Sequence, residues 1–452
     1  MPFIPHTDDD IALMLAEIGI GSVDELFSTI PQKIRQQHEP AVPEALSEQE
    51  LIRTVEKLAR GNMDCSRLRC FLGGGTYNHY IPPAVPHILS RSEFYTSYTP
   101  YQAEFSQGTL QSIFEFQTMV CELFGMDVAN ASMYDGAQAA AEAALMALRI
   151  RPKDKNGKIL MASSLNPLYK RTVRTYLAHL GREIEEIEYY SSGRMDLDRL
   201  RKDAGDAVAV LVQYPNYFGV LERMDEIGDI CGESGPVLIS VTSEPLAMGM
   251  LEPPSSFGAN IVAAEGQSLG IPMGFGGPHL GLFACKNDDK RKMPGRLVGM
   301  TEDRDGRQGF VLTLATREQH IRRGKATSNI CTNQGLMALA AAIYMGLTGP
   351  EGLEEIARVN RANSEYLKNL LEEKGAGKIA FSSPTFNEFV LDIAEDPGPV
   401  IEKMVRKGHL AGIPLKEEFP ELETHLLVTV TEMLSKQDLD DFARDLKQCL
   451  SE

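Results

Sequence analysis

The segment 320–333 combines a basic run with several hydroxyl groups. It reads HIRRGKATSNICTN, and Lys325, Thr327 and Ser328 follow one another closely within it. Ammonium and hydroxyl donors of this kind can bind phosphate through charge-assisted hydrogen bonds. We therefore consider Lys325, Thr327 and Ser328 candidate phosphate ligands. The alternative is a solvated basic loop with a Ser or Thr cap, which needs no function.

A second candidate segment is rich in tyrosine. Tyr95, Tyr98 and Tyr101 recur at a spacing of three in YTSYTPYQAEFSQG, and Glu104 follows them. The whole stretch 67–105 contains glycines and prolines that prevent long regular elements, and a loop of this length is usually functional or wraps a partner. The alternative is that the tyrosine rings are buried and that the polar groups cap the next helix.

A third segment, 132–138, opens a predicted helix with SMYDGAQ. The free N–H groups at a helix N-terminus attract an anion. A carboxylate at Asp135 would fill that niche itself and repel a second anion. We therefore predict that Asp135 is an N-cap, and this prediction weakens the case for a phosphate bound there.

The segment 258–281, GANIVAAEGQSLGIPMGFGGPHLG, follows a buried-strand pattern at 236–241 and contains no lysine. In one large class of vitamin B6 enzymes, this order of elements ends in the lysine that forms the Schiff base with the cofactor. Here the equivalent position falls on Gln267 or Ser268, and neither can form that bond. Nor does an aspartate occur between Ile239 and Asn260, where such enzymes hold the pyridine nitrogen. We therefore expect a cleft without its own cofactor.

Short apolar runs alternate with helical patterns between residues 158 and 265, which predicts an α/β fold with a mostly parallel sheet and helices on both faces. Residues 1–66 are predicted to be a helical N-terminal arm, with Ser-x-x-Glu capping boxes at Ser22 and Ser47. Residues 67–332 form the predicted large α/β domain. Residues 333–452 mix helices and strands and form a predicted smaller α+β domain.

Bulk composition excludes several function classes. The net charge of −18 argues against nonspecific nucleic-acid binding. No apolar run approaches the ~20 residues that span a membrane, and the start of the chain does not resemble a signal peptide. Seven scattered cysteines are typical of reduced thiols in a cytoplasmic protein, and their spacing is not a usual zinc pattern, so no metal site is expected.

Five long segments together resemble the P-protein family, the glycine decarboxylases of the glycine cleavage system. They are FLGGGTYNHYIPPAVP, YTPYQAEFSQGTLQSIFEFQT, QYPNYFGVLE, EGQSLGIPMGFGGPHLG and IRRGKATSNICTNQ. The resemblance extends over essentially the whole length. More narrowly, the chain resembles the N-terminal-half subunits, called subunit 1, which occur where the family's chain is split in two.

The resemblance implies a pyridoxal-phosphate fold type I protein whose C-terminal-half partner, subunit 2, carries the lysine and the cofactor. It implies an α2β2 heterotetramer that decarboxylates glycine and passes the aminomethyl group to the lipoyl group of H-protein. Active sites of such pairs lie between subunits. We therefore expect Lys325, Thr327 and Ser328 to reach the partner's cofactor phosphate, and Tyr98, Tyr101 and Glu104 to line the entrance for glycine or the lipoyl group.

On this interpretation the chain alone holds no catalytic residue and is inactive without its partner. Two rival interpretations remain open. In the first, the chain is a self-sufficient B6 enzyme whose Schiff-base lysine is Lys286 or Lys325. In the second, it is a purely structural subunit that contributes no residue to an active site.

Overall fold

The computed structural model describes residues 5–35, 41–152 and 157–451, and the chain divides into two compact units, Met1–Met63 and Asp64–Glu452. The first unit contains α1 (Asp8–Ile18), a 3₁₀ turn at Val23–Phe27 and α2 (Glu48–Ala59). Ser47 and Glu50 form the predicted capping box at α2. The box predicted at Ser22 is wrong, because the Ser22 side chain does not cap the short 3₁₀ turn that follows it.

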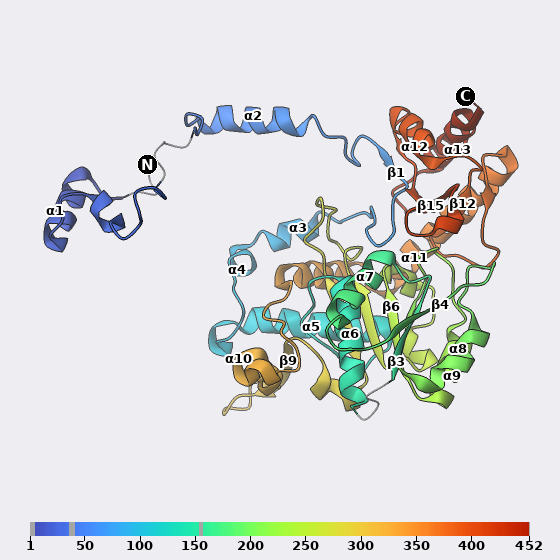
Figure 1. Cartoon of the computed structure of the whole chain (residues 1–452), viewed down its shortest axis with the longest axis horizontal. Helices are drawn as coiled ribbons and strands as arrows, with labels where there is room; N and C mark the ends of the chain where they lie inside the picture. The colour runs from blue at the N-terminus through green and yellow to red at the C-terminus, as the bar shows by residue number, and fades with distance from the viewer. Residues whose placement is uncertain (1–4, 36–40, 153–156, 452) are drawn as a thin grey trace. The chain divides into compact units, whose positions relative to one another are not determined.

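A seven-stranded sheet is the centre of the second unit (Figure 1). Its spatial order is β2-β8-β7-β6-β5-β3-β4, and every neighbouring pair is parallel except the two that involve β8. The predicted mostly parallel sheet is therefore confirmed. The strands are β2 (Val128–Ala129), β3 (Lys158–Ala162), β4 (Ile184–Ile187), β5 (Ala207–Gln213), β6 (Val237–Thr242), β7 (Ile261–Glu265) and β8 (Gly281–Cys285).

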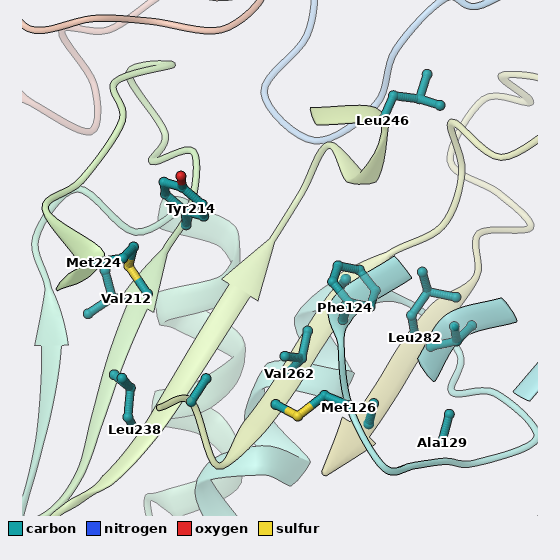
Figure 2. Packing of buried hydrophobic residues seen from close by; sticks show 14 of the residues in the cluster. Phe124, Met126, Ala129, Val212, Tyr214, Met224, Leu238, Leu246, Val262 and Leu282 are labelled. Carbon is teal, nitrogen blue, oxygen red and sulfur yellow. The ribbon is translucent and has the colours of Figure 1, made fainter. Parts of the chain in front are cut away.

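Helices cover both faces of this sheet, because successive side chains of a strand point to opposite faces and are apolar on both. Residues such as Ile159, Leu211 and Ile239 face α6 and α7. Val212, Leu238 and other residues on the opposite face pack with residues of α5, α9 and the first half of α11, as Figure 2 shows for part of this cluster. The helices are α5 (Gln107–Phe124), α6 (Gly136–Ile150), α7 (Pro167–Leu177), α8 (Leu197–Asp203) and α9 (Met224–Ser234).

The predicted irregular stretch before α5 contains only short elements, namely β1 (Arg69–Cys70), α3 (Ala84–Leu89) and α4 (Ser92–Tyr95), besides a 3₁₀ turn. After β8 the chain forms an antiparallel hairpin, β9 (Leu297–Glu302) and β10 (Gln308–Thr313), which the sequence did not predict. α10 (Gln319–Arg322) and a 3₁₀ turn at Arg323–Lys325 lead to the segment that precedes α11.

Helix α11 (Gly335–Lys374) bends at Gly349, which has a φ of 61° and directly precedes Pro350. Among the described residues, α11 is the one helix that is long and apolar enough to cross a membrane, a test that buried helices of soluble proteins also pass. Side chains of its first half, including Ala341 and Tyr344, are buried in the core of the large sheet. This packing explains its apolar composition without a membrane.

The C-terminal part contains a four-stranded sheet, in the order β11-β12-β15-β14, with α12 and α13 against it. The three-part division at 66/67 and 332/333 stays a proposal, and the first half of α11 packs with the large sheet. The elements are β11 (Lys378–Ile379), β12 (Glu388–Asp392), α12 (Pro397–Arg406), β13 (His409–Leu410), β14 (Ile413–Pro414), β15 (His425–Thr429) and α13 (Lys436–Ser451).

Candidate functional site

The cleft at the carboxyl ends of β6 and β7 is where an open α/β sheet binds its ligand. The N-terminus of α6 faces this edge, and Gly136 shows how close the approach is: a Cβ added there would lie 2.9 Å from the Cβ of Glu265 at the end of β7. The Gly136 amide donates to Glu265 Oε2 at 2.9 Å. The first helical N–H group that could bind a ligand anion is therefore used by the protein's own carboxylate.

Glu265 is 2% exposed and collects several further donors. Its Oε1 accepts hydrogen bonds from the amides of Gln267 and Leu280, at 3.0 and 3.1 Å. The His279 ring lies 3.3 Å from Oε2, and its hydrogen bond to Glu265 raises the pKa of His279. Three backbone N–H groups and one imidazole thus surround this single carboxylate.

Asp135 completes the closure of the niche. Its Oδ1 accepts from the Gln138 amide at 2.7 Å, which confirms the predicted N-cap. With Asp135 and Glu265 both at the start of α6, two carboxylates occupy the region that would seat a phosphate. Carboxylates at the place of the phosphate repel a further anion.

The two positions predicted to replace the lysine are both buried in the cleft. The Gln267 side chain accepts from the Tyr77 amide at 2.8 Å and donates to the Tyr77 carbonyl at 3.0 Å and to that of Ile271 at 2.7 Å. Ser268 Oγ is buried and has no hydrogen-bond partner within the described part of the chain. Gln267 therefore fixes the backbone of another segment instead of presenting a free group.

That segment, residues 73–80, lies between the seven-stranded sheet and the four-stranded C-terminal sheet. The Tyr77 hydroxyl donates to Glu388 Oε2 on β12 at 2.9 Å and lies 3.3 Å from Ser243 Oγ, just beyond β6. Glu388 also accepts from the Gly74 amide at 2.7 Å and from the Thr429 hydroxyl at 2.9 Å. Burial raises the pKa of Glu388 to about 7.

His79 forms a second bridge between the sheets. Its Nε2 lies 2.8 Å from Glu244, which follows β6, and its Nδ1 lies 2.8 Å from Glu432, which follows β15. Burial alone would lower the pKa of this imidazole. The two carboxylates outweigh that effect and raise the pKa of His79 to about 10. The ring is therefore a buried cation at neutral pH, held between two anions.

The residues of this cleft do not fit pyridoxal phosphate. Gln267 and Ser268 offer no amine, the start of α6 faces Glu265 and Asp135, and Glu244, the acid nearest to β6, is paired with His79. The segment 73–80 contacts the ends of β6 and β7 that a cofactor ring would approach. Within the described residues, no group of three or more His, Cys, Asp or Glu side chains could hold a metal ion.

Neither rival lysine lies in the cleft. Lys286 follows Cys285, the last residue of β8, which pairs with Ile261, the first residue of β7. Lys286 therefore lies at the amino end of β7, opposite to the cleft. Its Nζ contacts the Gly258 carbonyl at 3.4 Å. Lys325 ends the exposed 3₁₀ turn after α10. These positions speak against a self-sufficient B6 enzyme built on either lysine.

The predicted phosphate ligands form a rim beside α6, in which Lys325 is exposed and Thr327 and Ser328 are half-buried. Among the described residues, neither the Lys325 ammonium nor the Thr327 hydroxyl has a hydrogen-bond partner, and Thr327 and Ser328 border a cavity of about 470 Å³. Ser328 differs, because its hydroxyl donates to Glu142 at 2.8 Å and accepts from the Ile330 amide at 3.2 Å. In this conformation Ser328 has no proton left for a phosphate.

The predicted entrance residues are also exposed. Tyr98 is 84% exposed and Tyr101 is 56% exposed, so the alternative that these rings are buried is wrong. Glu104 lies exposed in a 3₁₀ turn after them. The structure brings the two predicted segments together, since Tyr98 and Asn333 border one cavity of about 200 Å³.

Arg296, which the sequence did not single out, connects these two segments. Its guanidinium donates to the Tyr101 hydroxyl at 3.0 Å, to Asn333 at 3.3 Å and to the Cys331 carbonyl. It also lies over the Tyr101 ring, 5.3 Å from the centroid. No local signal marks an arginine in the stretch PGRLVGM as buried and bridging.

Comparison with known proteins gives one consistent family. The sequence model described as "Glycine cleavage system P-protein" matches residues 1–446. A protein of Desulforamulus reducens named "Probable glycine dehydrogenase (decarboxylating) subunit 1" is 48% identical over 446 residues, 99% of each chain. A protein of the same name from Chloroherpeton thalassium is 48% identical over 451 residues, 99% of this chain and 100% of that one.

Solved structures agree. A glycine decarboxylase (P-protein) of the glycine cleavage system, in inhibitor-bound form, superposes with a TM-score of 0.90 at 39% identity, over 99% of this chain and 100% of that one. A Lactobacillus brevis glutamate decarboxylase has a TM-score of 0.70 at 12% identity, over 95% of this chain and 97% of that one, which shows a shared fold only. The fold is that of pyridoxal-phosphate enzymes of fold type I.

Proposed function

The chain belongs to the glycine cleavage system P-protein family, as a subunit 1 of glycine dehydrogenase (decarboxylating), and we propose that it acts only together with a second subunit that carries the pyridoxal phosphate. The observation that supports this proposal most directly is the closed cleft. Glu265 occupies the start of α6, and neither Gln267 nor Ser268, the two positions expected to replace the cofactor-binding lysine, carries an amine. The cofactor must then be held elsewhere in the pair.

In the proposed pair the cofactor supplies an electron sink for glycine decarboxylation, and the exposed rim of this chain completes the partner's site. Lys325 and Thr327 would donate to the cofactor phosphate, because the side chains of both have uncommitted donors within the described structure. Ser328 joins them only after its hydroxyl rotates away from Glu142. Tyr98, Tyr101 and Glu104 would line the entrance for glycine or for the lipoyl group of H-protein.

The proposed assembly is an α2β2 heterotetramer in the cytoplasm. Relatives named "subunit 1" support a second subunit. Acidic net charge and the buried first half of α11 support a protein that binds neither nucleic acid nor a membrane. The stoichiometry and the docking of H-protein are part of the proposal.

The test is to express the chain with and without its partner and to measure cofactor binding and glycine decarboxylation. Thr327→Ala combined with Ser328→Ala should lower the pair's cofactor affinity and its turnover. Thr172→Ala combined with Thr175→Ala is a matched control, because these hydroxyls on α7 only bond their own helix. Unchanged affinity and turnover in the first variant would contradict the proposed ligands.

The chain alone should give no absorbance of a cofactor adduct after incubation with pyridoxal phosphate. A stable, borohydride-trappable adduct at one lysine would refute the proposal. The purely structural subunit remains the second candidate. Substitutions on the rim that lower assembly, but never turnover per assembled pair, would favour it.

A further inference from the structure

Arg296 lies between the large sheet and the hairpin, in the turn that leads into β9. Its side chain is only 7% exposed, although it borders the rim where Lys325 and Tyr101 are exposed and Thr327 is half-buried. A buried guanidinium is costly unless its donors are paired. The partners that stabilise this one therefore show what the position is built to hold.

The donors of Arg296 are largely committed to this chain. Both terminal nitrogens donate, to Asn333 Oδ1, the Cys331 carbonyl and the Tyr101 hydroxyl. Nε is buried and has no hydrogen-bond partner within the described residues, but it faces Glu318 at 3.8 Å, so the charge is partly balanced. A guanidinium engaged in this way does not have a free fork for a substrate carboxylate or a phosphate.

The partners come from two segments that are far apart in sequence. Tyr101 belongs to the proposed entrance, whereas Cys331 and Asn333 follow the proposed phosphate-binding loop directly. Asn333 continues the connection, because its amide donates to the Ala131 carbonyl at 3.0 Å and to Ser132 Oγ at 3.1 Å, ahead of α6. Arg296 is thus the point where entrance, loop and the approach to α6 meet.

Ser132 adds a sign of constraint at this meeting point. Its φ is 129°, a backbone conformation that residues other than glycine rarely adopt. Strain of this kind persists only where the surroundings hold it, and it is commonest at functional sites. The Ser132 hydroxyl accepts from the Gln334 amide at 3.1 Å, which fixes the start of α11 to the same point.

We propose that Arg296 is a positioning residue for the glycine dehydrogenase reaction. It holds Tyr101 of the entrance and the phosphate-binding loop in one fixed relative geometry. The inference rests on the proposed function, because it assumes that both segments serve the partner's site. Arg296 touches neither substrate nor cofactor in this proposal. It acts through Tyr101 and through the backbone of residues 331–333.

The first test is made on the chain alone, by hydrogen exchange. Arg296→Lys keeps the charge but loses the planar fork, so one ammonium cannot hold Tyr101, Cys331 and Asn333 together. Amides in residues 98–105 and 326–333 should both exchange faster than in the wild type, while those of α6 should not. Arg194→Lys is the matched control, because Arg194 is half-buried and donates to the Leu221 carbonyl at 2.8 Å, outside the rim.

The second test is made on the assembled pair. Arg296→Lys should lower kcat/KM for glycine at least about tenfold, since a misplacement of about 1 Å at an active site can cost about a hundredfold. Assembly and cofactor loading are measured in parallel, so that turnover refers to loaded pairs. Tyr101→Phe, which removes only the hydroxyl acceptor, should cost less after Arg296→Lys than in the wild type, because the contact is already lost.

The outcomes separate the two levels of the proposal. If Arg296→Lys lowers thermal stability but leaves kcat and KM per assembled pair unchanged, Arg296 is a structural residue and the inference is overturned. Additive effects of Arg296→Lys and Tyr101→Phe also overturn it. Tyr98→Ala tests the entrance independently. If that variant lowers turnover while Arg296→Lys does not, only the inference on Arg296 fails; if neither does, the proposed entrance fails as well.

Discussion

Replacing His79 by glutamine should strongly destabilise the Asp64–Glu452 unit at neutral pH. The imidazolium lies between the Glu244 and Glu432 carboxylates, both at 2.8 Å. Glutamine is neutral, so the variant leaves two anions near each other without their cation. Breaking a buried ion pair by removing one partner costs about 3–5 kcal/mol.

The raised pKa of His79 gives a second way to calculate the free energy that these contacts contribute. Burial opposes the charged ring, but Glu244 and Glu432 raise the pKa of His79 to about 10, from 6.5 in the unfolded chain. A shift of this size corresponds to roughly 5 kcal/mol in favour of the protonated folded state. Because the folded pKa is the higher one, this stability is complete below pH 6.5 and is lost as the pH rises through 10.

The assay is urea unfolding at pH 6, 8 and 10, followed by circular dichroism, because the chain contains no tryptophan. His79→Gln should lose about 3–5 kcal/mol at pH 6 and clearly less at pH 10. His87→Gln, on the exposed side of α3, is the matched control. Adding Glu244→Gln to His79→Gln should restore part of the loss, because one unpaired anion disappears.

Two results would refute this reasoning. A loss below about 1 kcal/mol at pH 6 would mean that the Glu244–His79–Glu432 bridge is not an ion-pair network in solution. An unchanged slope of stability between pH 6.5 and 10 in the variant would mean that His79 does not titrate with a raised pKa.

Three further predictions concern the closed cleft. Gln267→Lys should not create a borohydride-trappable cofactor adduct, and it should lower the melting temperature, because the amide contacts with the Tyr77 backbone are lost; a trapped adduct would contradict the closed cleft. Glu265→Ala should cost about 3–5 kcal/mol by leaving buried N–H groups such as that of Gly136 without an acceptor, and inorganic phosphate should raise the melting temperature of this variant but not that of the wild type. In the wild type, the raised pKa of Glu388 stabilises the folded chain at low pH, and this contribution of about 3 kcal/mol is lost as the pH rises from 4.5 to 7. Glu388→Gln should remove this decline in stability. An unchanged urea-unfolding profile across that range would contradict the prediction.

Local signals were sufficient for much of the fold. Gly125 ends α5 in the left-handed conformation that glycine adopts most readily, and Asp135 caps α6 as predicted. The parallel sheet follows from alternating apolar runs, since strand and helix periods differ clearly. β8 was missed because its run follows a glycine-rich turn that was interpreted only as a ligand loop.

The closure of the cleft could not be predicted in the same way. The Glu265 carboxylate bonds an amide 129 positions away in sequence, and the Tyr77 hydroxyl bonds a carboxylate 311 positions away. No local periodicity encodes such contacts. The sequence showed that a lysine was absent, and it indicated through Asp135 that the niche was acidic, but it did not identify the residues that fill the space.

The role of Arg296 at the rim likewise could not be predicted from the local sequence. The candidate residues Lys325 and Tyr101 were recognisable by type and density, because phosphate binding and aromatic surfaces have local signatures. The residue that joins them was not, since a single arginine before an apolar strand is usually a surface residue. Its role depends on Cys331 and Asn333, whose carbonyl and amide meet it only in the folded chain.

The contacts in the closed cleft imply that a lysine alone would not create a cofactor site there. A cleft that lacked only the lysine would still offer an anion niche, and a single substitution could then supply the missing amine. Here Glu265 occupies the niche, Gln267 holds Tyr77, and His79 joins the two sheets, so each replacement also contributes to folding. Building a cofactor site here would therefore require several destabilising changes at once, whereas the service of the rim around Lys325 to a neighbouring site, as proposed, requires no change in this core.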